Sequence, residues 1–223
     1  MGTDIHLRVE KLVDGEWQYV KPPRVTRWGT RTWDEDWQED ENALEPRARN
    51  YNLFAFLADV RNGYGFAGTY RHKPIDPQFP GRGLPDGVDE EISYEEEDDV
   101  PYLGDHSFTW ATLTELLNAP WDMEFKTAGV VPESVHISLP IGSRPDSWSG
   151  GVSGGSTLTI QVDQYDELLR KDLLDPRIKY YIVRRWTWQP LKECDFRIWL
   201  DRDLVPLADG DTDSIRVIIG FDS

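Results

Sequence analysis

The first twenty residues alternate between apolar and polar positions. Ile5, Leu7 and Val9 stand at every second position, which is the period of a β-strand that buries one face. The dipeptide Asp14-Gly15 is typical of a tight hairpin turn, and residues 17–20 can return as the partner strand. The pattern therefore predicts a β-hairpin at the start of the chain.

A helical period begins after Asn50. Leu53 and Leu57 recur on one side of a helix that Asn50 can cap and that a glycine at position 63 can end. On a helix of this length, Arg61 falls inside the apolar sector. A guanidinium buried there needs an anionic partner, because leaving it unpaired is strongly unfavourable.

The same two periods predict the other elements. Helices are expected over residues 107–117, with Trp110 and Leu113 on one face, and over residues 165–171 and 196–207. The last segment, residues 215–221, is apolar on both faces, which indicates a central strand and a candidate neighbour of the first strand. Strand-like runs stand at residues 130–131, 135–139, 158–162, 179–188 and 215–221.

These elements predict an α+β fold, with a mostly antiparallel β-sheet and about three helices packed on it. Residues 1–223 are expected to form a single domain, because a chain of this length suffices for one hydrophobic core. Segments near 24–48, 86–100 and 142–156 are expected to be flexible, since they lack a clear period, carry a run of acidic residues or are rich in Gly and Ser.

Composition limits the classes of partner. The chain has 24 Lys and Arg against 41 Asp and Glu, a formal net charge of −17 at pH 7. Such a charge repels polyanions, so no binding to duplex nucleic acid is expected. An acidic surface can instead bind a basic protein or imitate DNA. An aromatic content of 12% excludes a disordered chain, and the single cysteine, Cys194, excludes a disulfide scaffold.

The sequence predicts a cytoplasmic protein. No apolar run approaches the roughly 20 residues that span a bilayer. The first residues lack the basic and apolar regions of a signal peptide, and a lone cysteine fits a reducing compartment. We therefore expect a soluble protein with no membrane partner.

Two Asp and His pairs are candidates for metal or acid–base chemistry. Asp4 and His6 stand two residues apart on a predicted strand and so share a face, and Asp105 and His106 stand at a predicted helix start. Carboxylates and imidazoles together can bind a metal ion or exchange protons. The alternative is that both histidines are structural residues bonded to the backbone. The four residues are weak metal candidates, and no cofactor follows from them.

Arg61 has two interpretations. Asp4 and Asp105 are the natural partners if the guanidinium forms a buried ion pair that holds the fold. Alternatively, Arg61 faces a cleft and holds the anionic group of a ligand.

Other residues indicate anion binding. Arg49 precedes a helix N-terminus, where backbone N–H groups favour anions, and Arg82 stands in a tight loop. Tyr64 and Phe66 lie in a Gly-rich stretch and could stack on a base. The alternative is that the glycines mark turns and the aromatic rings pack the loop. A Trp- and Arg-rich segment could be a stacking platform, a lid or a protein interface; it contains Arg24, Arg27, Trp28, Arg31, Trp33 and Trp37.

Several of these motifs together resemble an uncharacterised family of accessory proteins from bacteriophages and their bacterial hosts. The resemblance covers most of the chain. It rests on Met-Gly-Thr-Asp-Ile-His at 1–6, Arg-Asn-Tyr-Asn-Leu-Phe-Ala at 49–55, Leu-Ala-Asp-Val-Arg-Asn-Gly at 57–63, Gly-Phe-Ala-Gly at 65–68, Arg-Gly-Leu-Pro at 82–85, Asp-His-Ser-Phe-Thr-Trp at 105–110 and Ile-Gly-Phe-Asp at 219–222. It implies a phage-type accessory protein in the cytoplasm of the infected or host bacterial cell.

The residues and the resemblance lead to one prediction and two alternatives. The chain is predicted to bind a small anionic ligand, a nucleotide immune signal that it would sequester. The alternatives are a metal-assisted phosphodiesterase or related hydrolase acting on such a nucleotide, and an acidic protein-binding or DNA-mimic anti-defence factor. A second copy of the chain or a host protein are further candidate partners. The predicted ligand-binding residues are Asp4, His6, Arg49, Asn50, Arg61, Asn62, Tyr64, Phe66, Arg82, His106 and Trp110.

Overall fold

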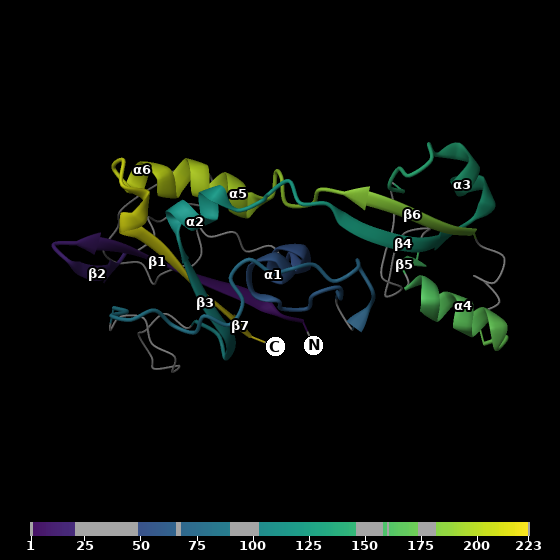
Figure 1. Cartoon of the computed structure of the whole chain (residues 1–223), viewed down its shortest axis with the longest axis horizontal. Helices are drawn as coiled ribbons and strands as arrows, with labels where there is room; N and C mark the ends of the chain where they lie inside the picture. The colour runs from purple at the N-terminus through teal and green to yellow at the C-terminus, as the bar shows by residue number, and fades with distance from the viewer. Residues whose placement is uncertain are drawn as a thin grey trace, which may run out of the picture. The chain divides into compact units, whose positions relative to one another are not determined.

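A computed structural model describes residues 2–20, 49–65, 68–89, 103–145, 158–159, 161–173 and 182–222. The described residues form two compact units, each with its own antiparallel β-sheet (Figure 1). Unit 1 consists mainly of residues from Tyr51–Asp76 and Asp122–Leu191, and unit 2 of residues from Thr3–Asn50, Pro77–Trp121 and Lys192–Ser223. The predicted α+β fold is confirmed. We expected one domain over residues 1–223, and the structure divides into these two units.

The sheet of unit 2 has the strand order β2-β1-β7-β3. The hairpin of β1 (Asp4–Val13) and β2 (Glu16–Tyr19) forms as predicted, with a turn in which Asp14 and Gly15 have φ of 53° and 89°. Strand β7 (Ile215–Asp222) lies between β1 and β3 (His106–Thr112), so the apolar segment near the end of the sequence is the central strand that its composition indicated.

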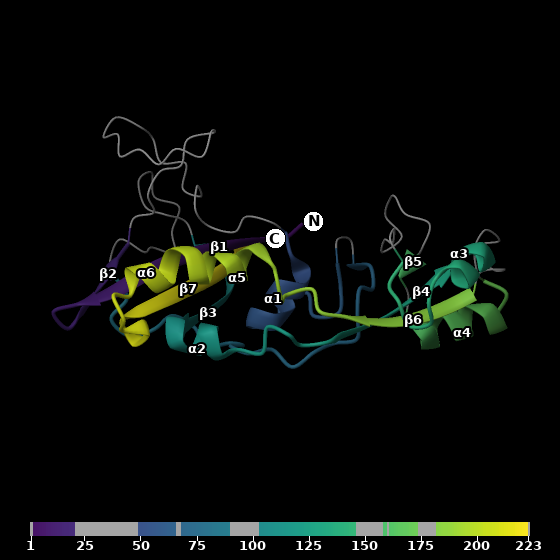
Figure 2. The ribbon, with the colours of Figure 1, turned by 90° about the horizontal axis from the view of Figure 1, so that it is seen from above.

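The two faces of this sheet are covered differently. Ile218 of β7 packs with Leu103 and has Leu84 and Val88 against it. Because neighbouring residues of a strand point to opposite faces, Val217 and Ile219 point the other way. Figures 1 and 2 show the helical run along one face of the sheet. That run comprises α5 (Asp195–Trp199), a π-helical turn (Leu200–Leu204) and α6 (Val205–Leu207), as predicted for residues 196–207.

The predicted helix over residues 107–117 is wrong in its first half. His106–Thr112 is strand β3, paired with β7, and helix α2 (Leu113–Asn118) begins only after it. Thr112 caps the helix, since its hydroxyl accepts a hydrogen bond from the Glu115 N–H and the Glu115 carboxylate accepts one from the Thr112 N–H. The edge of β7 supplies backbone partners that an isolated helical pattern does not reveal.

The sheet of unit 1 has the order β5-β4-β6, with β4 (Phe125–Val131) between β5 (Leu158–Thr159) and β6 (Ile182–Trp188). Figure 1 shows α3 (Glu133–Ser138) and α4 (Val162–Arg170) on opposite sides of this sheet. Helix α4 confirms the helix predicted near residues 165–171. The strand expected over 135–139 is wrong, because those residues lie in α3 and the turn after it, and from 158–162 only Leu158 and Thr159 are described as a strand.

Helix α1 (Tyr51–Ala58) begins directly after Asn50 and is buried from its second residue to its last. It ends earlier than the sequence indicated, because Asp59 takes a left-handed backbone with φ of 64°. Arg61 is left-handed as well, with φ of 51°. Arg61 therefore lies in a turn after the helix, and its predicted place in the apolar sector of a helix is wrong.

Parts of the segments expected to be flexible are held by hydrogen bonds. The guanidinium of Arg216 donates to the carbonyls of Asp86 and Gly87, both at 3.1 Å. The Arg184 side chain donates to the Ser143 carbonyl at 2.9 Å and hydroxyl at 2.8 Å. Residues 86–89 and 142–145 are thus anchored at these points, while residues 24–48, 90–100 and 146–156 lie outside the described residues.

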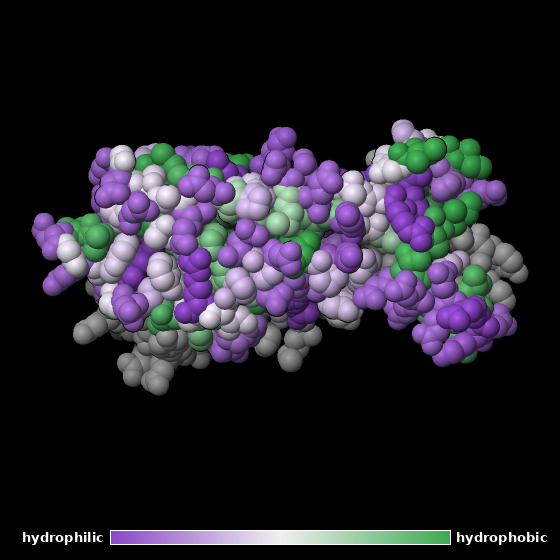
Figure 3. Space-filling view, in the orientation of Figure 1, coloured by the Kyte–Doolittle hydropathy of each residue, from purple (hydrophilic) through white to green (hydrophobic). Residues whose placement is uncertain are grey.

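Apolar side chains stay exposed around α3. Figure 3 shows hydrophobic residues gathered over this helix. Ile137 is 73% exposed, and α3 contributes no buried residue. The helix therefore covers one side of the unit 1 sheet with little apolar burial of its own.

Candidate functional site

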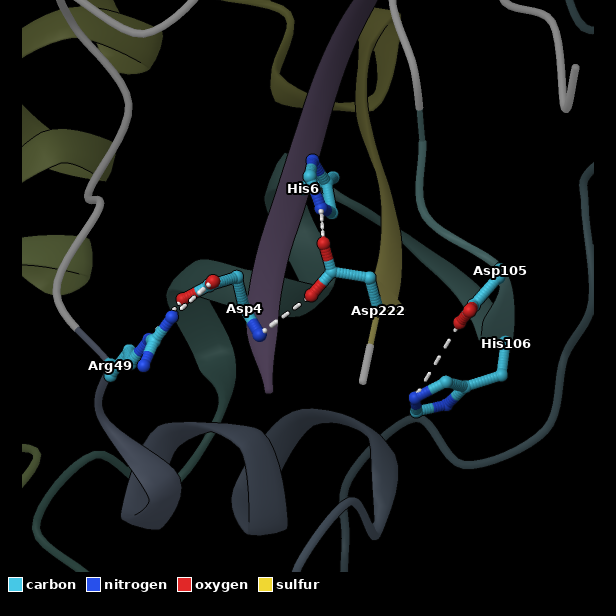
Figure 4. Close-up of polar contacts among 6 residues, drawn as sticks. All are labelled: Asp4, His6, Arg49, Asp105, His106 and Asp222. Carbon is cyan, nitrogen blue, oxygen red and sulfur yellow. Dashed lines mark hydrogen bonds and ion pairs between the residues drawn. The ribbon is translucent and has the colours of Figure 1, made fainter. Parts of the chain in front are cut away.

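A chain of polar contacts joins the first and last strands of unit 2 (Figure 4). Asp4 and Asp222 are cross-strand partners, and the Asp4 N–H donates to Asp222 Oδ1 at 3.0 Å. The other oxygen of Asp222 lies 3.1 Å from His6 Nε2. Arg49 contacts both oxygens of the Asp4 carboxylate, at 2.5 Å and 2.7 Å. The structure thus brings Asp4, His6 and Arg49 together, with Asp222 as the residue that sequence reasoning had not included.

The Arg49 side chain is engaged by the protein itself. Its hydrogen bonds to Asp4 hold the pKa of that carboxyl below its ordinary value. The two side chains are 54% and 42% exposed, so water screens the pair. A guanidinium in a two-pronged contact with a carboxylate is poorly placed to bind a second anion.

His106 does not join this cluster. His6 pairs with Gly220 and His106 with Phe221, so the two imidazoles belong to opposite faces of the sheet. His106 stacks on the Phe221 ring, with centroids 6.2 Å apart, and its Nδ1 lies 2.9 Å from the Ser107 hydroxyl. His6 and His106, both predicted to bind the ligand, therefore do not lie in one cluster.

The four weak metal candidates are divided in the same way. Asp105 lies 3.9 Å from His106 Nε2, while Asp4 and His6 lie on the other face. In the part of the chain that the structure describes, no group of three or more His, Cys, Asp or Glu side chains is arranged to hold a metal ion.

Arg82 is likewise paired within unit 2. Two of its nitrogens donate to the two oxygens of Glu115, each at 2.9 Å. Its guanidinium lies over the rings of Phe79 and Trp110, at 4.9 Å and 5.6 Å from their centroids. Trp110 is therefore a residue of strand β3 that contacts Arg82 and the Leu103–Ile218 cluster, and its predicted place on the face of a helix is wrong.

The predicted residues of unit 1 form a separate turn. Arg61 donates to the Gly65 carbonyl at 3.3 Å and lies over the Tyr51 ring, 5.2 Å from its centroid. The amide of Asn62 is bonded in both directions to Ile75. Tyr64 is 42% exposed, and its hydroxyl accepts a hydrogen bond from Gln161 at 3.2 Å. Phe66 lies outside the described residues.

A different part of unit 1 is hollowed. An open cavity of about 690 Å³ lies beside β4, β6 and the first turn of α4. That volume is in the range of sites for small molecules. Its lining residues are Tyr70, Lys73, Pro74, Lys126, Thr127, Ala128, Gly142, Gln161, Val162, Asp163, Arg185, Trp186 and Thr187, and we call this cavity the unit 1 hollow.

The unit 1 hollow is cationic. Lys73, Lys126 and Arg185 are exposed residues of its lining, against one acid, Asp163. The strand register pairs Lys126 with Thr187 and Ala128 with Arg185, so these four residues share one face of the sheet. Within the described ranges, the side chains of Lys73, Lys126 and Arg185 form no ion pair with a carboxylate. In this they differ from Arg49 and Arg82, whose carboxylate partners lie in unit 2.

The walls of the hollow combine apolar and aromatic groups. Val162, Pro74 and Ala128 are apolar, and Tyr70 supplies a half-buried ring. Burial raises the pKa of the Tyr70 hydroxyl, and the nearby Tyr64 and Asp163 raise it further. The arrangement can accept a ligand that has an apolar or planar part and a negatively charged part.

None of the predicted ligand-binding residues lines this hollow. A signal for it was nevertheless present in the sequence. Lys126 stands between Phe125 and Thr127, and Arg185 stands between Arg184 and Trp186, so each cation occupies the outward position of a strand whose neighbouring residues are buried. No sequence pattern indicates the place of Lys73. Its position beside the hollow is fixed by the hydrogen bond from its backbone N–H to the Lys126 carbonyl, which joins segments far apart in the sequence.

The chain was compared with known proteins. No family model, curated protein or solved structure matches it. The resemblance to a phage family therefore stays a prediction from the motifs. No helix of the described residues is long and apolar enough to cross a membrane.

Proposed function

We propose that the chain binds a small anionic ligand in the unit 1 hollow. The observation that carries the proposal is the contrast between cations. Arg49 and Arg82 are each held by a carboxylate, whereas Lys73, Lys126 and Arg185 line a cavity with no carboxylate partner among the described residues. In a chain of net charge −17, three cations around a cavity favour an anion at that place.

A nucleotide is the ligand class that we propose to test first. Its phosphates suit the lysines and the arginine, and its base suits a wall that contains Tyr70, Pro74 and Val162. Sequestration of a nucleotide signal remains the biological role expected from the sequence. The ligand class is the one predicted from the sequence, whereas the proposed binding residues are those of the unit 1 hollow and not the predicted ones.

The test is a calorimetric titration of the full chain with ATP, cyclic AMP and inorganic tripolyphosphate. Arg185→Ala should weaken binding about tenfold or more, since a hydrogen bond to a charged group contributes about 1.5–3 kcal/mol. Arg170→Ala is the matched control, because Arg170 is an exposed arginine at the opposite end of α4 from the hollow. Product analysis after each titration separates binding from the hydrolase alternative.

Two results would overturn the proposal. One is the absence of heat with all three compounds at low salt. The other is binding that Arg185→Ala and Lys126→Ala leave unchanged, which would place the anion elsewhere.

The protein-binding alternative depends on the acidic run of residues 86–99, of which residues 90–99 lie outside the described ranges.

A further inference from the structure

Asp163 is an acidic residue in a cationic cavity. It is the second residue of α4 and is exposed, and it is the one acid among the residues that line the hollow. Its carboxylate forms no hydrogen bond or ion pair with another residue that the structure describes. It lies near enough to Tyr70 to raise the pKa of that hydroxyl. An ionised carboxylate can only accept hydrogen bonds, so at this place it repels bare anions.

We propose that Asp163 accepts a hydrogen bond from a hydroxyl or amino group of the ligand. This inference rests on the proposed anion site and narrows its ligand to a phosphate ester that carries donors, with a nucleoside phosphate as the class that fits. Lys73, Lys126 and Arg185 then bind the phosphates, and Asp163 accepts the hydrogen bond from the hydroxyl or amino group of the nucleoside. The hollow thereby prefers a nucleoside phosphate to a polyphosphate of similar charge.

A competing explanation for Asp163 is local. Acidic residues in the first turn of a helix interact favourably with its dipole, whatever the helix binds. Under that explanation Asp163 only repels ligands, and its removal tightens the binding of every anion by the same factor. The two explanations therefore predict opposite signs for a ligand that carries donors.

The experiment compares ATP with inorganic tripolyphosphate, which has the same phosphate chain without ribose and base. For Asp163→Ala we expect tripolyphosphate to bind about two- to threefold more tightly, since one repelling charge is removed in a largely aqueous setting. ATP should bind about fivefold more weakly, because the lost charge-assisted hydrogen bond outweighs that relief. The ratio of the two dissociation constants should therefore change by about tenfold.

Asp166→Ala is the matched control, because Asp166 is an exposed acid of the same helix that does not line the hollow. It should leave the ratio unchanged. Titration with 2′,3′-dideoxy-ATP assigns the donor, since this compound keeps the amino group and lacks both ribose hydroxyls. Circular dichroism of each variant verifies that α4 is intact.

The outcomes separate the two proposals. If wild-type protein binds neither ATP nor tripolyphosphate, the anion site is refuted and this inference with it. If both bind and Arg185→Ala weakens both, yet Asp163→Ala tightens both equally, the anion site stands and the role of Asp163 is refuted. A change in the ratio that only Asp163→Ala produces supports both.

Discussion

Neutralising one buried carboxylate should strongly destabilise the unit 2 sheet. The side chains of Glu10 and Arg216 are 0% and 3% exposed, and Arg216 Nε lies 2.5 Å from Glu10 Oε2. The Arg216 guanidinium also stacks on Trp17, 4.1 Å from the ring centroid, and Glu10 Oε1 accepts the N–H of Asp89 at 2.7 Å. Glu10→Gln keeps the shape of the side chain and leaves the buried guanidinium without a countercharge.

The magnitude follows from burial. Breaking a buried ion pair at one partner costs about 3–5 kcal/mol, a large part of the roughly 5–15 kcal/mol that stabilises a domain. Hydrogen exchange monitored by peptide measures the loss locally. Amides of β1 and β7 should exchange at least about 100-fold faster, since about 1.4 kcal/mol corresponds to a factor of ten. Amides of β4 and β6 in unit 1 serve as the internal control and should not change.

A double variant tests the cause. Glu10→Leu with Arg216→Met removes both charges, so it should be less destabilised than the sum of the two single variants, by about 2 kcal/mol or more. If Glu10→Gln changes the free energy of unfolding by less than about 1 kcal/mol, or if the two sites are additive, the buried charge pair is not what holds this face of the sheet.

Three further predictions concern single positions. Gly220→Ala should prevent correct folding, because a Cβ there would lie 1.8 Å from the Leu103 carbonyl oxygen, and solubility with circular dichroism will show it. The lowered pKa of Asp4, caused by Arg49, contributes stability that is present above the unfolded pKa and lost as the pH falls through the folded pKa. Asp4→Asn should therefore reduce the gain in the free energy of unfolding between about pH 3 and pH 5. The reduction should be less than about 1 kcal/mol, because the pair is exposed to water. Burial raises the pKa of the Cys194 thiol, so a disulfide reagent at pH 8 should modify it only after urea unfolds the chain.

Each of these three has an outcome that contradicts it. Gly210→Ala, where a Cβ would meet nothing within 4 Å but φ is +94°, measures backbone strain alone, and an equal loss at Gly220 would remove the steric argument. An unchanged acid profile for Asp4→Asn would show that its pair with Arg49 adds no stability. Rapid modification of Cys194 in the native protein would show that the thiol is reached by solvent.

The secondary structure could be predicted where the spacing of apolar residues fitted either a strand or a helix clearly better than the other. Alternation and the Asp14-Gly15 turn predicted the β1–β2 hairpin, and an apolar run on both faces predicted that β7 is central. The helix predicted for the β3 segment was wrong because the spacing of its apolar residues fits a helix and a strand alike. The capping box of Thr112 and Glu115, which marks where α2 begins, was visible in the sequence and would have corrected the boundary.

The candidate site was less accessible to sequence reasoning because it depends on pairing over long distances. The ion pair of Arg49 and Asp4 joins residues 45 positions apart in the sequence, and that of Arg82 and Glu115 joins residues 33 positions apart. No local pattern shows that these cations are already engaged. The cations of the unit 1 hollow came together for a similar reason, since Lys126 and Arg185 become neighbours only through the register of β4 and β6.

The position of β7 constrains how the chain can be made. Strand β1 is synthesised long before β7, its neighbour in the middle of the sheet, which is completed only when residue 222 has been added. During translation β1 can form its hairpin with β2, but its other edge stays without a partner for about 200 residues of synthesis. This sheet therefore cannot be completed until residues 215–222 have been synthesised, and in the meantime the edge of the hairpin that β7 later covers is a surface to which a chaperone can bind.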